Sequence, residues 1–151
     1  MSPLAAVIFC ALMTASAATD LAARRIPNWL TGGVALAALV LASPHGGAEW
    51  ASRGLSFAVL GGAALALFIV RALGGGDAKL LMAGALWMPF ASLSTFVVFL
   101  ALAGGVQAAG ALALRAVAAG GDAGPLRRRV PYGLSIAAAG IGWALVQALR
   151  P

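Results

Sequence analysis

The sequence predicts an all-α integral membrane protein, a six-transmembrane-helix bundle with its amino terminus outside. Three observations support this prediction. Of the 151 residues, 62% are hydrophobic and only 9% are charged, whereas a soluble domain has about half its residues apolar and about a quarter charged. The sparse charges divide the chain into apolar segments long enough to cross a bilayer. The basic residues also gather on alternate connections between these segments.

The composition excludes several classes of protein. A chain with a mean hydropathy of +0.99 is neither a water-soluble globule, nor a disordered chain, nor a disulfide-stapled secreted domain. Cys10 is the one cysteine, so an intrachain disulfide and a structural zinc site are both excluded. Because the connections are short, we expect a single membrane-embedded domain over residues 1–151.

Each uncharged segment predicts a helix. Residues 1–19, 26–48, 54–70 and 130–149 are each about 17 to 23 residues long, enough for one crossing at about 1.5 Å per residue. Residues 80–114 are too long for one crossing and barely long enough for two. We place the break within residues 87–92, because Pro89 ends a helix and the aromatic residues beside it suit the headgroup layer. The fourth of six helices is then short.

Residues 1–20 have some features of a cleavable signal peptide, but they lack its basic amino-terminal region, so we interpret them as the first helix. Paired glycines at positions 32–33, 61–62 and 104–105 fall within the predicted spans. We expect them to let neighbouring helices approach closely.

The basic residues predict the orientation. With the amino terminus outside, Arg53 and Arg150 lie on the outer side and the rest of the ten Lys and Arg residues lie in the cytoplasm, as the positive-inside rule requires. The basic excess therefore reflects contact with the lipid bilayer, and we expect no nucleic-acid partner. The cytoplasmic basic residues are Arg24, Arg25, Arg71, Lys79, Arg115, Arg127, Arg128 and Arg129.

Only four residues are acidic. We expect Glu49, beside Arg53 in an outer connection, and Asp122, in a glycine-rich connection, to be solvated or ion-paired. Asp20 closes the first predicted helix and Asp77 opens the fourth, so the topology brings two carboxylates to the same cytoplasmic membrane depth. Ionisable groups at such positions are functional candidates.

The sequences around these two aspartates are unusual. After Asp20 the chain returns to the membrane within about eight residues, and Pro27 suits the first turn of the second helix. Before Asp77, the run Gly74-Gly75-Gly76 frees the backbone to end the third helix and turn sharply. Asp77 can then cap the fourth helix. A purely structural role stays open for both residues, Asp77 as a cap and Asp20 as the partner of a nearby basic residue.

Two segments carry a resemblance to a known family. Asp20 with Ile26-Pro27-Asn28, and Gly74-x-Gly76-Asp77-Ala78-Lys79, resemble the two signature segments of the type IV prepilin peptidases, which are bacterial GxGD membrane aspartic proteases. Val130-Pro131-Tyr132-Gly133 resembles the third, non-catalytic segment of that family. The resemblance implies that Asp20 and Asp77 are the catalytic pair.

The resemblance also implies the substrate and the location. The substrate is a prepilin with a short basic leader and an apolar helix, cut after a glycine at the cytoplasmic face of the bacterial inner membrane, with the pilus assembly machinery as a further partner. Longer family members carry a cysteine-containing methyltransferase domain between the first two spans. Here that connection has about eight residues and no cysteine. The chain therefore resembles the short CpaA/TadV-like peptidases of tight-adherence (Flp) pili, and we expect no methylation.

Two carboxyl groups that share one proton can hydrolyse a peptide. The ionised one takes a proton from water while the protonated one polarises the carbonyl, so neither a metal nor a cofactor is expected. As a hypothesis, the start of a helix favours the ionised form of Asp77, which leaves Asp20 as the proton carrier. Two other classes stay open: a small transporter component in which the aspartates relay protons or bind cations, and a structural subunit of a pilus export assembly.

Overall fold

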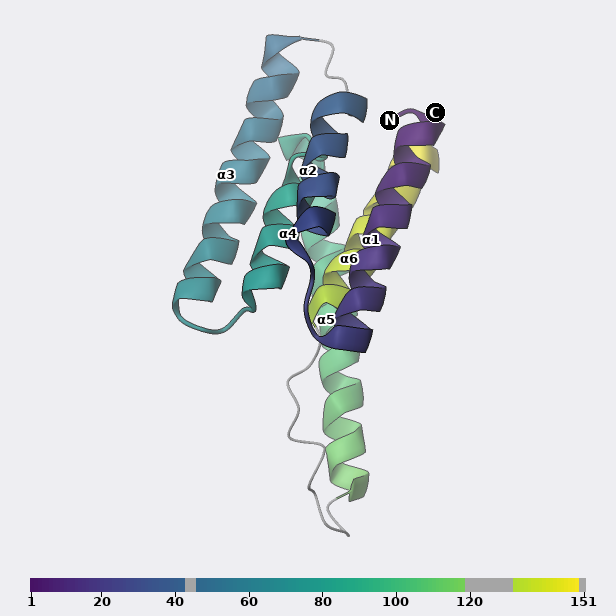
Figure 1. Cartoon of the computed structure of the whole chain (residues 1–151), viewed down its shortest axis with the longest axis vertical. Coiled ribbons are helices and arrows are strands. Elements are labelled where there is room, and N and C mark those ends of the chain that lie inside the picture. Colours follow the sequence, from purple (N-terminus) through teal and green to yellow (C-terminus); the bar gives the residue numbers. More distant parts are fainter. Residues whose placement is uncertain (43–45, 119–131, 150–151) are drawn as a thin grey trace.

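A computed structural model of the chain describes residues 1–42, 46–118 and 132–149. Within these ranges every regular element is an α-helix, which confirms the predicted all-α fold class. Asp122, the basic run 127–129, Val130, Pro131 and Arg150 lie outside the described residues. The helices, shown in Figure 1, are α1 (Pro3–Ala23), α2 (Asn28–Leu41), α3 (Gly47–Ile69), α4 (Gly75–Ala85), α5 (Phe90–Ala118) and α6 (Tyr132–Leu149).

Four of these helices, α1, α3, α5 and α6, are long and apolar enough to cross a membrane. The other two are shorter. α4 has 11 residues and measures about 16 Å, as expected from the break before Pro89. α2 has 14 residues and ends at Leu41, whereas the uncharged segment extends to residue 48. Large hydrophobic side chains such as Val106 and Trp29 are more than two-thirds exposed, as lipid-facing residues are expected to be.

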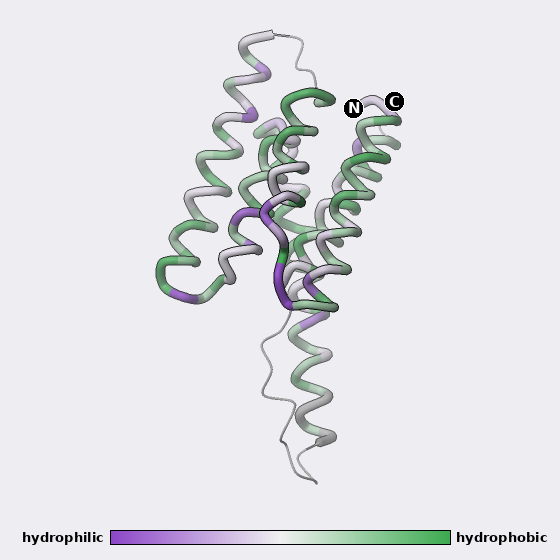
Figure 2. The backbone as a smooth tube through the Cα atoms, viewed as in Figure 1, coloured by the Kyte–Doolittle hydropathy of each residue, from purple (hydrophilic) through white to green (hydrophobic). Residues whose placement is uncertain are grey.

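The two ends of the bundle differ. The amino end of α1 and the carboxyl end of α6 lie side by side at one end (Figure 1). The carboxyl end of α1 and the amino end of α4 lie at the other, where α5 extends beyond its neighbours. Hydrophilic residues are concentrated on the connection between α1 and α2 and on the turn after α3, both at this second end (Figure 2).

Local sequence explains where the helices begin and end. Ser2 caps α1, with its Oγ accepting the N–H of Ala5 at 3.2 Å. α1 ends at Arg24, whose φ of 50° is left-handed and whose N–H donates to the carbonyl of Asp20. Pro27 is the N-cap of α2 and so precedes its first turn.

The chain also reverses after α3. Arg71 has a φ of 59°, whereas no described glycine adopts the left-handed region. Gly74 is the N-cap of α4, in extended conformation. The prediction that the glycine run makes this turn is therefore wrong, because the turn is made at Arg71, and the glycines serve another purpose.

Helix packing is centred on aromatic residues. α1 packs against α6, α6 against α5, and α4 against both α2 and α3. Phe9 lies between two buried indoles, with ring centroids 4.9 Å from Trp87 and 5.8 Å from Trp143. The Trp87 indole N–H donates to the carbonyl of Val34 at 2.9 Å, which fixes the carboxyl end of α4 against α2. This core holds the opposite end of α4 in position beside α1.

Candidate active site

Asp20 lies in the last turn of α1 and is only 7% exposed. Its Oδ2 accepts the backbone N–H of Gly133 at 3.0 Å. Gly133 is the second residue of α6, so the amino end of that helix rests on the carboxyl group of Asp20. A Cβ at position 133 would lie 2.6 Å from Oδ2, closer than any real contact. A side chain at this position would therefore displace the carboxyl group of Asp20.

Asp77 lies in the first turn of α4, outside the four long candidate spans. Burial and the charge of Asp20 raise the pKa of Asp77 to about 6, against the opposing effect of a hydrogen bond from the backbone of Gly74. The raised pKa contradicts the hypothesis that the start of the helix favours the ionised form of Asp77. Gly74 occupies the N-cap position and Asp77 is the third residue of α4, so the Asp77 carboxyl group caps the helix by accepting the backbone N–H of Gly74.

One cavity joins these residues. It has a volume of about 370 Å³ and contains both aspartates together with the backbone of the glycine run. Of the site residues predicted from the sequence, the structure brings all but Pro27 to this cavity. Its lining residues are Asp20, Arg24, Arg25, Ile26, Asn28, Gly74, Gly75, Gly76, Asp77 and Lys79.

The glycines of the run make room for their neighbours. A Cβ on Gly74 would lie 2.9 Å from Oδ2 of Asp77. A Cβ on Gly76 would lie 3.2 Å from the Cβ of Ile26 and 3.4 Å from its backbone nitrogen. The first glycine therefore admits the carboxyl group of Asp77, and the second admits the segment that joins α1 to α2. The two predicted signature segments are in direct contact.

Residues 7–109 match the model of the type IV leader peptidase family. The chain belongs to this family. The match covers about two-thirds of the chain and includes both aspartates, α1 from residue 7 onward, and all of α2 to α4. Comparison with curated proteins and with solved structures gives no match. The family assignment made from the sequence is confirmed, and the chain is a multi-pass membrane peptidase of the leader peptidase class.

The other predicted residues of this leader peptidase connect its two short helices. Lys79 on α4 donates from Nζ to Oδ1 of Asn28 on α2 at 3.0 Å. Ile26 is buried against Gly76, and Pro27 ends the connection as the N-cap of α2. These residues hold the connection from Asp20 to α2 beside the amino end of α4.

The role of Gly133 was not predicted. Its segment was interpreted as non-catalytic, and the family match ends at residue 109. The bond to Asp20 joins residues 113 positions apart and uses a backbone N–H, so no side-chain pattern reveals it. The one available signal was a glycine at the start of the last helix.

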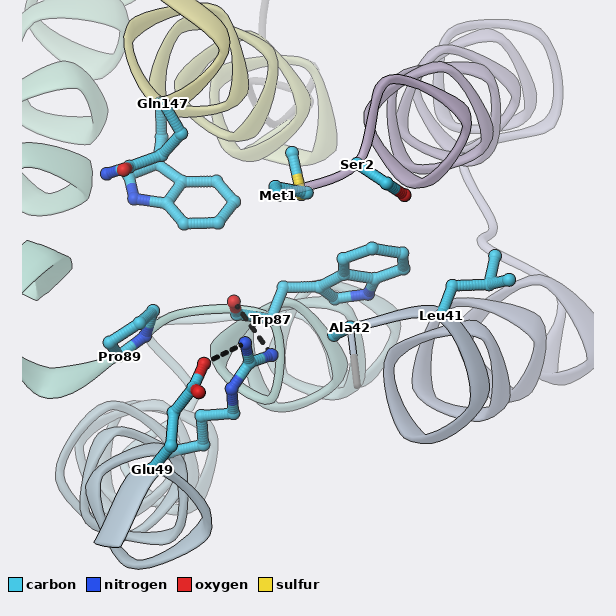
Figure 3. Close-up of a pocket in the computed structure, with 10 residues that line it drawn as sticks. Met1, Ser2, Leu41, Ala42, Glu49, Trp87, Pro89 and Gln147 are labelled. Carbon is cyan, nitrogen blue, oxygen red and sulfur yellow. Dashed lines mark hydrogen bonds and ion pairs between the residues drawn. The ribbon is translucent and has the colours of Figure 1, made fainter. Parts of the chain in front are cut away.

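A second cavity, of about 390 Å³, lies at the other end of the leader peptidase, with Met1 and Gln147 on one side and Glu49 of α3 on the opposite side (Figure 3). Here Arg53 donates from Nη2 to Oε1 of Glu49 at 2.8 Å, and from Nη1 to the carbonyl of Trp87. The predicted ion pairing of Glu49 is confirmed. One carboxylate that is already paired with arginine does not provide the two-carboxyl chemistry of the aspartate cavity.

The described part of the chain has no cluster of side chains that could hold a metal ion. Within residues 1–42, 46–118 and 132–149, no three His, Cys, Asp or Glu side chains gather at one place. The aspartate cavity combines two carboxyl groups with the basic residues Arg24, Arg25 and Lys79. This arrangement suits hydrolysis by water that a carboxylate activates.

Proposed function

We propose that this leader peptidase is an aspartic endopeptidase that removes the leader of Flp-type prepilins, with Asp20 and Asp77 as its catalytic pair. The observation that carries the proposal is the shared cavity, in which burial and the charge of Asp20 raise the pKa of Asp77 to about 6. Two carboxyl groups in such a site resist joint ionisation, so Asp77 retains its proton up to about pH 6, well above the range in which an ordinary aspartate loses it.

The chemistry assigns a different task to each aspartate. Asp77 carries the proton and polarises the scissile carbonyl, because its pKa is the one raised. Asp20 takes a proton from water, which attacks the carbonyl carbon. The carbon–nitrogen bond then breaks, and the proton of Asp77 passes to the leaving nitrogen. The Gly133 N–H holds Oδ2 of Asp20, which leaves Oδ1 to face the water.

Charge supports an active site at the cytoplasmic face of the inner membrane. Arg24, Arg25 and Lys79 line the aspartate cavity, and Arg71 makes the turn at the same end of the bundle. The other end has the buried Arg53, which Glu49 neutralises. Under the positive-inside rule the basic end faces the cytoplasm, so the amino terminus lies outside.

The short connection between α1 and α2 supports the Flp type. α1 ends at Ala23 and α2 begins at Asn28, and the connection between them packs against Gly76. This leaves no room for an inserted methyltransferase domain. We therefore propose that the chain cuts prepilin without methylating the product.

Co-expression with a prepilin tests the proposal. We expect the pilin recovered from membranes to begin at the residue after its leader, as amino-terminal sequencing would report. Asp20→Asn and Asp77→Asn should each abolish cleavage while the protein still inserts into the membrane. Normal processing by either purified variant would overturn the two-aspartate mechanism. Ion flux in proteoliposomes without cleavage would instead favour a transporter.

A further inference from the structure

A lateral groove of about 310 Å³ opens beside the aspartate cavity. α4 forms its floor, since α4 packs against both α2 and α3, and the groove opens between those two helices. From α2 it is lined by Asn28, Thr31, Gly32 and Ala35, which are spaced i, i+3, i+4 and i+7. This spacing places all four residues on one face of the helix.

α4 contributes the same spacing. Lys79, Met82, Ala83 and Leu86 follow one face of this helix for two turns. Phe57 of α3, which is 41% exposed, forms the opposite side. Two helices of the bundle thus present matched stripes to one groove, and each stripe is about 10 Å long at 1.5 Å per residue.

The groove is continuous with the aspartate cavity. Asn28 and Lys79 line both, and the hydrogen bond between them marks where one meets the other. The lining is polar at this junction and becomes apolar toward Ala35 and Leu86. A chain that fits both spaces therefore has an apolar segment in the groove and, directly adjoining it, a polar segment at the aspartates.

The surface of the groove suits a helix. Gly32 is exposed, and a Cβ built there meets no atom within 4 Å, so its backbone is uncovered on the groove side. The paired-glycine prediction of packing within the bundle is therefore wrong at this position. Ala35 and Ala83 are also small. In lipid, small residues let a second helix approach closely, and packing rather than hydrophobicity holds the two together.

We propose that this groove binds the apolar helix of the substrate, in the segment that follows the scissile bond. The substrate helix packs on Gly32, Ala35 and Ala83, and it gives way to extended chain at the level of Asn28 and Lys79. The scissile bond then reaches Asp20 and Asp77. This inference rests on the proposed function, and it assigns the enzyme's recognition of the substrate to α2 and α4.

Filling the groove tests the inference. Gly32→Leu adds a side chain to the groove, and Gly62→Leu is its matched control, because Gly62 on α3 is also exposed with open space around it but does not line the groove. Each variant is assayed on full-length prepilin in proteoliposomes, below saturation, and on a soluble peptide that spans the cut site without the apolar helix.

We expect Gly32→Leu to slow cleavage of full-length prepilin about tenfold, the effect of losing about 1.4 kcal/mol of packing. Its rate on the short peptide, and both rates of Gly62→Leu, should match the wild type. Equal rates of the two variants on full-length prepilin would overturn the groove assignment, as would equal slowing of Gly32→Leu on both substrates. If the wild type cut neither full-length prepilin nor the short peptide, the proposed function itself would be refuted.

Cross-linking identifies the occupant directly. In a Cys10→Ser, Asp77→Asn background, Gly32→Cys should cross-link to a single cysteine in the apolar helix of uncut prepilin, whereas Gly62→Cys should not. A cross-link only between two copies of the enzyme would overturn the inference in favour of self-association. Labelling of position 32 by a photoactivatable lipid, undiminished by added prepilin, would overturn it in favour of lipid.

Discussion

The backbone N–H of Gly133 donates a 3.0 Å hydrogen bond to Oδ2 of Asp20, across 113 residues of chain. The amino end of α6 thereby fixes one oxygen of the carboxyl group of Asp20, and a side chain at position 133 would occupy the place of that oxygen. A segment without a reactive side chain thus determines how Asp20 is oriented.

Gly133→Ala should lower kcat roughly 10- to 100-fold with little change in KM, because a displaced carboxyl group loses its alignment while the substrate groove is untouched. Steady-state kinetics on prepilin measure both constants. Gly62→Ala serves as the control, since its Cβ meets open space. A wild-type kcat for Gly133→Ala would show that Asp20 does not depend on this contact.

The activity should fall as pH rises. Burial and Asp20 raise the pKa of Asp77 to about 6, so the proton that it supplies is present below that pH and lost above it. We expect kcat/KM to decrease about tenfold for each pH unit above about 7. Rates measured on detergent-solubilised enzyme between pH 5 and pH 9 give the profile. A flat profile across this range would contradict Asp77 as the proton carrier.

The thermal stability of the protein should also depend on pH through the titration of Asp77. The pKa of Asp77 is raised on folding, so its contribution to the free energy of unfolding is present below about pH 4 and is lost as pH rises through about 6. Asp77→Asn should therefore unfold at a higher temperature than the wild type at pH 8, and the difference should shrink at pH 5. Each kcal/mol gained corresponds to about 2–4 °C in a chain of this size.

Thermal unfolding in detergent, followed at both pH values, measures the effect. Glu49→Gln is the comparison, because Glu49 forms an ion pair with Arg53 at the other end of the bundle and its loss should destabilise the protein. An Asp77→Asn variant that is less stable than the wild type at pH 8 would show that burial of the ionised carboxyl group does not lower the free energy of unfolding.

The three consecutive glycines should tolerate alanine unequally. A Cβ at Gly74 meets Oδ2 of Asp77 at 2.9 Å, and a Cβ at Gly76 meets the backbone of Ile26 at 3.4 Å. At Gly75 the nearest atom, at 3.3 Å, belongs to the ring of Phe68, which can move. Prepilin cleavage should fall at least about tenfold in the Gly74 and Gly76 variants, through misplacement of the site, and by less than about twofold in Gly75→Ala.

Membrane insertion and thermal stability of all three variants provide the control. If Gly75→Ala were as inactive as Gly74→Ala, the glycine run would be required for backbone freedom. The contacts described above would then not explain why three glycines occur together.

Much of this arrangement is readable from the sequence because charge and proline are strong signals in a membrane. The break before Pro89 predicts the short α4, and alternating spans place Asp20 and Asp77 at one end. The pKa of Asp77 is not readable, because burial and the proximity of Asp20 arise only when the folded bundle brings the two residues to one cavity. The groove is not readable either, since an uncovered glycine such as Gly32 looks the same in sequence as a packed one such as Gly61.

The left-handed turns at Arg24 and Arg71 have a consequence for how the protein is made. Glycine at either position would relieve backbone strain on the order of 1 kcal/mol. It would also remove a positive charge that, in the proposed orientation, contributes about 1 kcal/mol of attraction to anionic lipid headgroups. A glycine variant would thus relax the finished fold while weakening the signal that the insertion machinery reads. At these two residues, correct insertion during synthesis and stability afterwards place opposite demands on the same side chain.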